Sequence, residues 1–314
     1  MSDLDHSGLA QRVLTRVVGR VREIELVVAA LAADRHVLLE GPPGTGKSTL
    51  LRAVAHELGL GFEFVEGNAE LTPARLVGHF DPARVLSDGY DPDVFVDGPL
   101  VTAMRDGSLL YVEEINRIPE ETLNVLITVM SERELHVPRL GRVAASPGFR
   151  LVAAMNPFDA IGTARISSAV YDRVCRLSVD YQDAPDEASI VQAALPDAAV
   201  DPVWLRRVVE VVRRTRTHGD VRIGSSVRGA IDTVAVASTL SKMRGTSADD
   251  EAVGLDAALV ALSGRLRLRE GCSRSAESIV TELWNEVFAE PDPAAGEGDG
   301  EGKAHAPTGA SKGR

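Results

Sequence analysis

A glycine-rich loop at residues 41–49, GPPGTGKST, holds the residue types that bind phosphate. It matches the pattern G-x-x-x-x-G-K-[ST], in which glycines let backbone N–H groups approach phosphate oxygens. Lys47 would contact the β- and γ-phosphates, and the Ser48 hydroxyl would bind Mg²⁺. The loop therefore predicts nucleoside triphosphate binding rather than a plain strand-to-helix turn. The expected contact positions are Gly41, Pro42, Pro43, Gly44, Thr45, Gly46, Lys47, Ser48 and Thr49.

Two carboxylates end the apolar run SLLYVEE at 108–114. A buried strand that delivers acids at its carboxyl end indicates the ligand-binding edge of an open α/β sheet. Glu113 is expected to hold Mg²⁺ together with Ser48, and Glu114 to act as general base for an attacking water. Most such sites have Asp where Glu113 stands, so the longer side chain puts the rate of hydrolysis in question. The alternative is a solvated acidic pair at the start of a helix.

A polar residue also ends the apolar run FRLVAAMN at 149–156. Asn156, followed by Pro157, could orient the same water against the γ-phosphate. Asn is equally a common turn residue before proline, so taken alone it fits either role. The loop and Glu114 favour the water-orienting role.

The elements that must position these side chains alternate along the chain. Short apolar runs without strict alternation are typical of parallel strands covered on both faces, and they occupy 36–41, 62–67, 108–114, 149–156 and 173–181. Helical patterns occupy 10–33, 47–58, 119–132 and 163–172. This alternation predicts an α/β fold with a doubly wound, five-stranded parallel sheet.

The pattern changes after about residue 184, where strand-like runs stop. Helical segments follow at 186–195, 201–217, 225–240, 251–264 and 274–289. We therefore predict a nucleotide-binding core over 1–183 and an all-helical domain over 184–290. Residues 291–314 are rich in Gly, Ala and Pro without periodic apolar residues, which predicts a disordered tail.

The composition is that of an ordinary globular protein. The 314 residues are 44% apolar and carry 34 Lys+Arg against 46 Asp+Glu, a net charge of −12. This balance excludes a chain that coats nucleic acid by bulk charge. Cys175 and Cys272 are expected to be small buried side chains in a reducing compartment. No apolar run approaches the roughly 20 residues of a membrane span, and no signal-like start is present, so we expect a cytoplasmic protein.

In their order and spacing, GPPGTGKST, LLYVEEINRIP, AAMNPFDAIGT, SSAVYDRVCRL and IGSSVRGA resemble a MoxR-type AAA+ ATPase. The leading VVGRVREIELVVAALAADRHVLLEG and the GPLVTAMRDG before the acidic strand are also similar to that family. The resemblance covers roughly residues 12–289. It implies a P-loop αβα core with the Asn156 strand between the loop strand and the acidic strand, a helical lid, ATP with Mg²⁺, and a hexameric ring.

The resemblance also assigns residues to roles. The family's Walker A, Walker B and sensor 1 positions fall on Lys47 and Ser48, on Glu113 and Glu114, and on Asn156. Arg173, in AVYDR, matches the arginine finger that reaches a neighbour's γ-phosphate. Arg228, in GSSVRG, matches the sensor 2 arginine of the lid. The alternatives are an Arg173 that pairs only with Asp172 and an Arg228 that is a solvated helix residue.

Two segments fit loops that this clade inserts into the core. Residues 70–96 contain several turn formers, and residues 134–148 are predicted to form a hairpin centred near Leu140-Gly141. In related rings such elements face the pore or the remodelled partner. Plain surface connections are the alternative.

Three functions remain open from the sequence. The resemblance favours an ATP-hydrolysing chaperone that activates a client enzyme, commonly with a separate protein that carries a von Willebrand factor A domain. A nucleic-acid motor is disfavoured, because the six arginines of 206–222 are not interleaved with aromatic residues and the chain is acidic. Glu113 sustains the third possibility, a nucleotide-gated assembly factor that hydrolyses weakly.

Overall fold

The computed structural model describes residues 6–157, 166–198 and 200–290. Contacts between residues divide the chain into two compact units, 1–194 with 226–228 and 195–225 with 229–314. Contacts group the helix α9 (Ala184–Ala194) with the first unit, and the domain boundary at 183–184 stays a prediction. The predicted tail from 291, and part of the segment that follows Asn156, lie outside the described residues.

The first unit is built on a five-stranded parallel sheet of the predicted kind. Its strand order is β2-β5-β8-β1-β9, and the strands are β1 (His36–Glu40), β2 (Phe62–Glu66), β5 (Leu109–Glu113), β8 (Arg150–Met155) and β9 (Val174–Ser178). The strand that precedes Asn156 lies between the loop strand and the acidic strand, as the family resemblance implies. The two cysteines were expected to be buried, which is wrong: Cys175, on the edge strand β9, is exposed and Cys272 is partly exposed.

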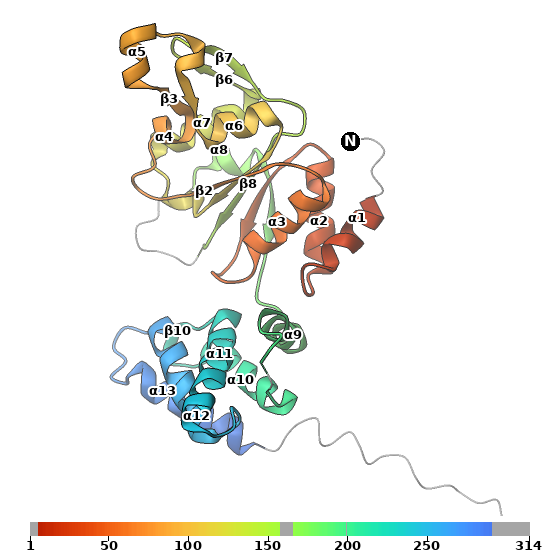
Figure 1. Cartoon of the computed structure of the whole chain (residues 1–314), viewed down its shortest axis with the longest axis vertical. Coiled ribbons are helices and arrows are strands. Elements are labelled where there is room, and N and C mark those ends of the chain that lie inside the picture. The colour runs from red at the N-terminus through yellow and green to blue at the C-terminus, as the bar shows by residue number, and fades with distance from the viewer. Residues whose placement is uncertain (1–5, 158–165, 199, 291–314) are drawn as a thin grey trace, which may run out of the picture. The chain divides into compact units, whose positions relative to one another are not determined.

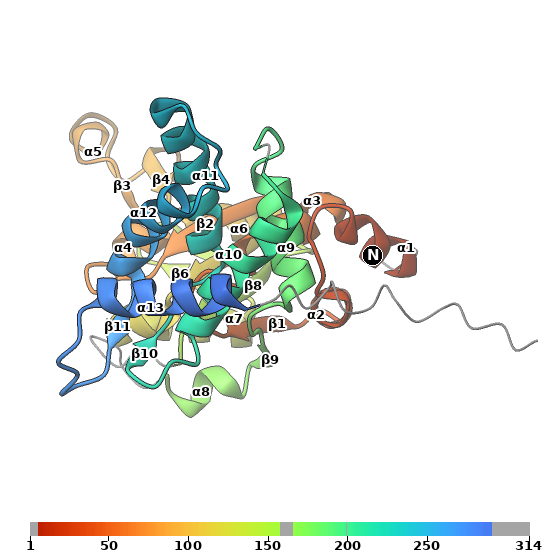
Figure 2. The same ribbon diagram turned by 90° about the horizontal axis from the view of Figure 1, so that it is seen from below.

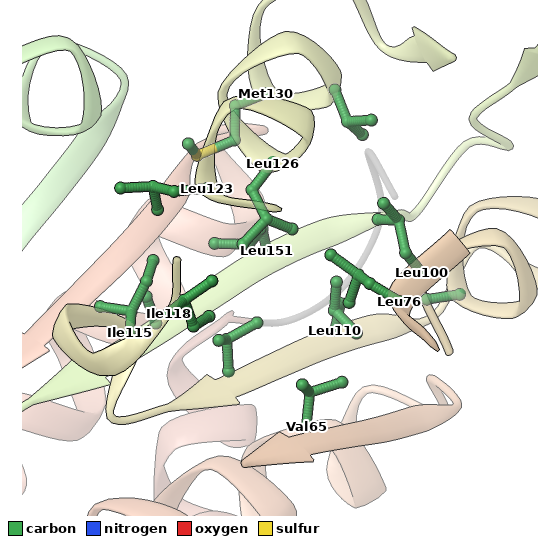
Figure 3. Close-up of a cluster of buried hydrophobic side chains, with 14 of the residues drawn as sticks. Val65, Leu76, Leu100, Leu110, Ile115, Ile118, Leu123, Leu126, Met130 and Leu151 are labelled. Carbon is green, nitrogen blue, oxygen red and sulfur yellow. The ribbon is translucent and has the colours of Figure 1, made fainter. Parts of the chain in front are cut away.

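Helices cover both faces of this sheet (Figure 1). One face packs against α1 (His6–Leu14), α2 (Val21–Ala32) and α3 (Lys47–Glu57), and the other against α4 (Pro73–Val77), α6 (Pro99–Asp106) and α7 (Glu120–Glu132). Successive strand residues alternate between these two clusters, because side chains of a strand point to opposite faces. Leu110 and Leu151 pack under Leu123 and Leu126 of α7 (Figure 3). The near-continuous apolar strands follow from this two-sided burial.

The predicted helical region 10–33 is two helices rather than one. Between α1 and α2 the chain turns at Gly19 and Arg20, with φ angles of 66° and 62°. A Cβ at Gly19 would lie 2.0 Å from Asp186 Oδ2, so the turn packs closely on the start of α9. The local close approach overrides the helical periodicity of the sequence.

Two inserts interrupt the core. Residues 134–148 form the predicted hairpin, with β6 (Glu134–Val137) and β7 (Gly141–Ala144). The segment 70–96 is more ordered than its composition indicates, with α4, β3 (Gly78–Phe80), α5 (Pro82–Asp88), the 3₁₀ turn Pro92–Val94 and β4 (Phe95–Asp97). A short α8 (Ser168–Tyr171) precedes β9.

The second unit is helical but not wholly so. Its helices are α10 (Pro202–Thr215), α11 (Val227–Arg244), α12 (Glu251–Leu262) and α13 (Ala276–Ala289). A short antiparallel pair, β10 (Val221–Ile223) with β11 (Arg267–Leu268), corrects the all-helical expectation. Trp284 of α13 packs where a Cβ at Gly254 of α12 would come within 2.5 Å, so glycine permits close packing of these helices. No described helix is both long and apolar enough to cross a membrane.

Candidate nucleotide site

The predicted P-loop, residues 41–49, joins β1 to α3 and depends on glycine. Gly44 and Gly46 have φ angles of 74° and 80°, a region that side chains disfavour. A Cβ at Gly41 would lie 1.9 Å from the carbonyl oxygen of Val179, so packing also requires glycine there. The loop ends at the first turn of α3, whose unpaired N–H groups suit an anion.

Lys47, the first residue of α3, is held inside this loop at 7% exposure. Its Nζ donates to the carbonyl oxygens of Gly41 at 2.9 Å and Pro42 at 2.7 Å. Burial lowers the pKa of Lys47 to about 8, although the nearby charge of Glu113 opposes the shift. A desolvated ammonium group surrounded by a glycine cradle fits the anionic oxygens of a triphosphate.

Three oxygen-bearing side chains meet next to the loop. The Ser48 hydroxyl lies 3.4 Å from Glu113 Oε1 and 3.3 Å from the Tyr111 hydroxyl. Tyr111 and Glu113 are two residues apart on β5 and therefore share the face that packs against α3. Oxygen donors are the ligands that Mg²⁺ prefers, so Ser48 and Glu113 fit the predicted metal role. We did not predict Tyr111, although its place two residues before Glu113 is the signal that could have identified it.

Glu114 has different surroundings from Glu113. It adopts φ 52° and ψ 43°, a left-handed conformation that is uncommon for residues other than glycine. The turn directs its carboxylate to Arg117, whose Nη1 lies 3.1 Å from Glu114 Oε2. Both side chains are more than a third exposed, so water reaches this acid. The adjacent acids thus have separate environments, as distinct metal-binding and base roles require.

Asn156 follows β8 at the same edge of the sheet. The register pairs Glu40 of β1 with Met155 of β8, and the Gly41 N–H donates to the Met155 carbonyl oxygen at 3.1 Å. The residue before Asn156 is therefore hydrogen-bonded to the start of the P-loop. The loop, the two acids and Asn156 all come to the carboxyl edge, as parallel strands require.

A buried arginine that we did not predict supports the loop from behind. The Arg20 side chain is 3% exposed, and its Nη2 donates to the carbonyl oxygens of Thr45 at 2.8 Å and Asp180 at 2.6 Å. It ties the P-loop to the segment after β9. No local sequence pattern could reveal it, because its partners are backbone atoms from distant segments.

Arg173 lies at the opposite, amino edge of the sheet. It directly precedes β9, which runs parallel to β1 with Val174 opposite His36, and Figure 2 shows the two strands side by side. The five residues of β1, about 16 Å, therefore separate it from the P-loop of its own chain. Its Nη1 donates to the Ala169 carbonyl oxygen at 2.7 Å and its Nε to the Ser131 hydroxyl. Within the described residues Arg173 forms no ion pair with Asp172.

Arg228 is the second residue of α11. Contacts group residues 226–228 with the first unit, whereas the rest of α11 belongs to the second. The sensor 2 role of Arg228 stays a prediction.

The geometry agrees with the comparisons to known proteins. Residues 36–174 match the AAA domain of the dynein-related subfamily, a span that runs from β1 through the P-loop and the acids to the start of β9. An uncharacterized protein of Staphylococcus haemolyticus is 33% identical over 207 residues, which cover 63% of this chain and 76% of that protein. The chain thus contains an AAA domain.

Other relatives match this AAA protein over part of their length. An uncharacterized protein of Staphylococcus epidermidis is 35% identical over 157 residues, 49% of this chain and 59% of the relative. The chain thus spans less than two thirds of that relative.

Solved structures share the fold. A putative ATPase from Cytophaga hutchinsonii has a TM-score of 0.50 at 19% identity, covering 89% of this chain and 93% of that one. RuvB of Thermotoga maritima, a Holliday junction branch migration motor, has a TM-score of 0.55 at 17% identity, covering 80% and 72%. At these identities the likeness concerns the fold alone, a P-loop core followed by a helical part.

Proposed function

We propose that this AAA protein is a MoxR-type chaperone that hydrolyses ATP in a hexameric ring of identical subunits. The observation that carries the proposal is the position of Arg173, which lies at the sheet edge opposite to Lys47 of its own chain. An arginine finger at that edge would serve the nucleotide of an adjacent subunit. Each active site would then need two copies of the chain.

The carboxyl-edge residues divide the work of hydrolysis. ATP with Mg²⁺ supplies the γ-phosphoryl group that water attacks. Lys47 and the P-loop N–H groups bind phosphate oxygens, while Ser48 and Glu113 hold the metal ion. Glu114 accepts the proton of the attacking water, and Asn156 orients that water.

Two arginines complete the proposed site. Arg173 of the adjacent subunit stabilises the charge that develops in phosphoryl transfer. Its two hydrogen bonds, to Ser131 and Ala169, orient the guanidinium before any nucleotide arrives. Arg228 would act from the lid of the same chain that binds the nucleotide.

The two inserts would contact the client protein. The Arg139 guanidinium of the hairpin lies 3.6 Å from the ring centroid of Tyr90, so the inserts pack against each other. Leu86 is 90% exposed and Val96 48% exposed on the first insert. Exposed apolar side chains on a shared projection suit transient contact with another polypeptide. A separate protein with a von Willebrand factor A domain is the partner that we propose.

The alternative function is a nucleic-acid motor, because RuvB, which shares the fold, is such a motor. The arginine-rich α10 gives it little support, because two of its arginines are engaged within the second unit. Arg207 donates to the Phe288 carbonyl oxygen at 3.0 Å, and Arg214 pairs with Glu210 and Glu290 at 2.9 and 2.7 Å. The four valines of this helix are buried, namely Val208, Val209, Val211 and Val212.

The test compares ATPase activity and particle mass of the full chain with those of Lys47→Ala. The proposal expects Mg²⁺-dependent hydrolysis, ring-sized particles with ATP, and a co-purifying protein with a metal-ion adhesion site. Hydrolysis stimulated by DNA with a steep salt dependence would instead favour the motor. ATP binding with negligible turnover would favour the third possibility, a nucleotide-gated assembly factor in which Glu113 slows hydrolysis.

A further inference from the structure

Two Asp-Arg dipeptides stand side by side at the amino edge of the sheet. Asp34-Arg35 precedes β1 and Asp172-Arg173 precedes β9. The register pairs His36 of β1 with Val174 of β9. Arg35 and Arg173 directly precede these two residues, so they lie next to each other at the starts of two adjacent parallel strands. Adjacent strands lie about 4.8 Å apart. The fold therefore brings Arg35 to the same place as the proposed finger.

A pocket of about 410 Å³ opens at this edge. It is lined by both dipeptides, by the starts of β1 and β9, and by residues at and after the end of α7. His36 lines it without adding charge, because burial lowers the pKa of His36 to about 4 and leaves the ring neutral at pH 7. The charge of the pocket is set by its arginines and aspartates.

Asp34 does not neutralise Arg35. Asp34 Oδ2 accepts from Arg133 Nη1 at 2.8 Å, and Asp34 Oδ1 pairs with the buried Arg150. Asp34 is thus already shared by two guanidinium groups other than Arg35. Within the described parts of the chain, the Arg35 side chain is exposed and forms no hydrogen bond or ion pair. A cationic pocket in a chain of net charge −12 indicates an anionic partner.

We propose that Arg35 is a second arginine that acts in trans on the triphosphate bound by the adjacent subunit. The inference rests on the proposed function, because it needs the shared active site that Arg173 implies. The guanidinium groups of Arg35 and Arg173 match the several oxygens of the β- and γ-phosphates. The carboxyl edge of the adjacent copy, with its acids and bound nucleotide, supplies the complementary negative charge.

The two arginines have different tasks. Arg173 is fixed by Ser131 and Ala169, which suits the stabilisation of charge that develops in the transition state. Arg35 has no such restraint and becomes ordered only when the neighbour's phosphates are present. Loss of Arg35 should therefore weaken ATP binding and ATP-dependent assembly more than turnover at saturation.

Single variants test this division. Arg35→Ala should raise the KM for ATP roughly tenfold or more, the scale of a lost charge-assisted hydrogen bond, and should weaken ATP-dependent ring assembly. Arg35→Lys should recover part of the loss. The matched control is Arg22→Ala, an exposed arginine of α2 that does not line the pocket. An Arg35→Ala protein that matches Arg22→Ala in KM and in particle mass overturns the inference.

A mixing experiment tests whether Arg35 acts in trans. Subunits with Arg173→Ala keep their own Arg35 and Lys47. To hydrolyse ATP at their own site, they need only Arg35 and Arg173 from the neighbouring subunit. We expect Lys47→Ala subunits to restore their hydrolysis, and Lys47→Ala/Arg35→Ala subunits to restore it roughly tenfold less well at subsaturating ATP. If Lys47→Ala and Lys47→Ala/Arg35→Ala subunits restore hydrolysis equally, the inference is overturned. If neither restores hydrolysis, the KM of Arg35→Ala for ATP decides. Wild-type hydrolysis by Arg173→Ala alone is a different result, which defeats the proposed function instead.

Discussion

Among single residues, Lys47 carries the clearest physical constraint. Burial lowers its pKa to about 8, so the free protein loses this charge as the pH rises through 8. Bound phosphates favour the protonated form, and binding above that pH must therefore take up a proton. We expect ATP affinity to be constant below about pH 7 and to fall by up to about tenfold per pH unit above the pKa. Equilibrium titration with ATP across this range measures the effect.

The control for this titration is Lys47→Ala. Without the amino group, ATP affinity should drop by roughly tenfold or more, because a charge-assisted contact is lost, and the remaining affinity should not vary with pH in the same window. A wild-type affinity that stays flat from about pH 7 to about pH 9.5 would contradict the role of a buried, titrating Lys47.

Glu114, the proposed general base, gives a second prediction at the scale of a single residue. Glu114→Gln should bind ATP but hydrolyse it at least about a hundredfold more slowly, because an amide does not accept the proton of water. ATP binding and phosphate release, measured on the same protein, separate the two effects. Glu120→Gln, an exposed glutamate at the start of α7, is the matched control. If Glu114→Gln retains hydrolysis within about threefold of the wild type, another group is the base.

At the scale of elements, the parallel strands could be predicted because each is an uninterrupted apolar run. β5 is an example: its acids mark the carboxyl end, and the observed strand ends at Glu113. Short strands such as β3 and β11 could not be predicted. With three and two residues, they carry no periodic signal, and packing rather than propensity forms them.

The same distinction applies to the candidate site. The P-loop and the acidic pair could be predicted because their chemistry requires particular residues close together in the sequence. Arg20 and Ser131 could not be found in this way. Each has a partner that is distant in the sequence, and both bond to backbone oxygens that any residue supplies.

The helix α7 links the two edges of the sheet, which gives an element-scale prediction. It begins shortly after Glu114 and ends where Ser131 accepts a hydrogen bond from Arg173 while donating to the Ile127 carbonyl oxygen. Ser131→Ala should lower the kcat by roughly twofold to tenfold, the scale of one hydrogen bond, and leave ATP affinity unchanged.

Two variants show whether Ser131 positions Arg173 or only supports the helix. Ser131→Thr keeps the hydroxyl group and should restore most of the kcat. Thr128→Ala removes a similar hydroxyl, which donates to the Asn124 carbonyl oxygen in the previous turn of α7, and should have little effect. Equal losses of kcat in Ser131→Ala and Thr128→Ala would reduce Ser131 to a structural role.

At the scale of the whole molecule, the proposed shared active site depends on two edges of one sheet. Lys47 and Glu114 occupy the carboxyl edge, and Arg35 and Arg173 occupy the amino edge. Under the proposed function, a single chain holds two halves of an active site that it does not join. A closed ring of copies would join every pair of halves, whereas an isolated subunit would bind ATP without efficient hydrolysis.

The most direct test of this central claim is the ATPase rate of Arg173→Ala, alone and mixed with Lys47→Ala under subunit exchange. Alone, Arg173→Ala should bind ATP nearly normally and lose turnover by roughly 10³-fold, while Lys47→Ala should be inactive because its own site is empty. The mixture contains interfaces that pair an intact Lys47 with an intact Arg173, and the account predicts recovered hydrolysis there. An Arg173→Ala protein that hydrolyses ATP at the wild-type rate by itself would contradict the account.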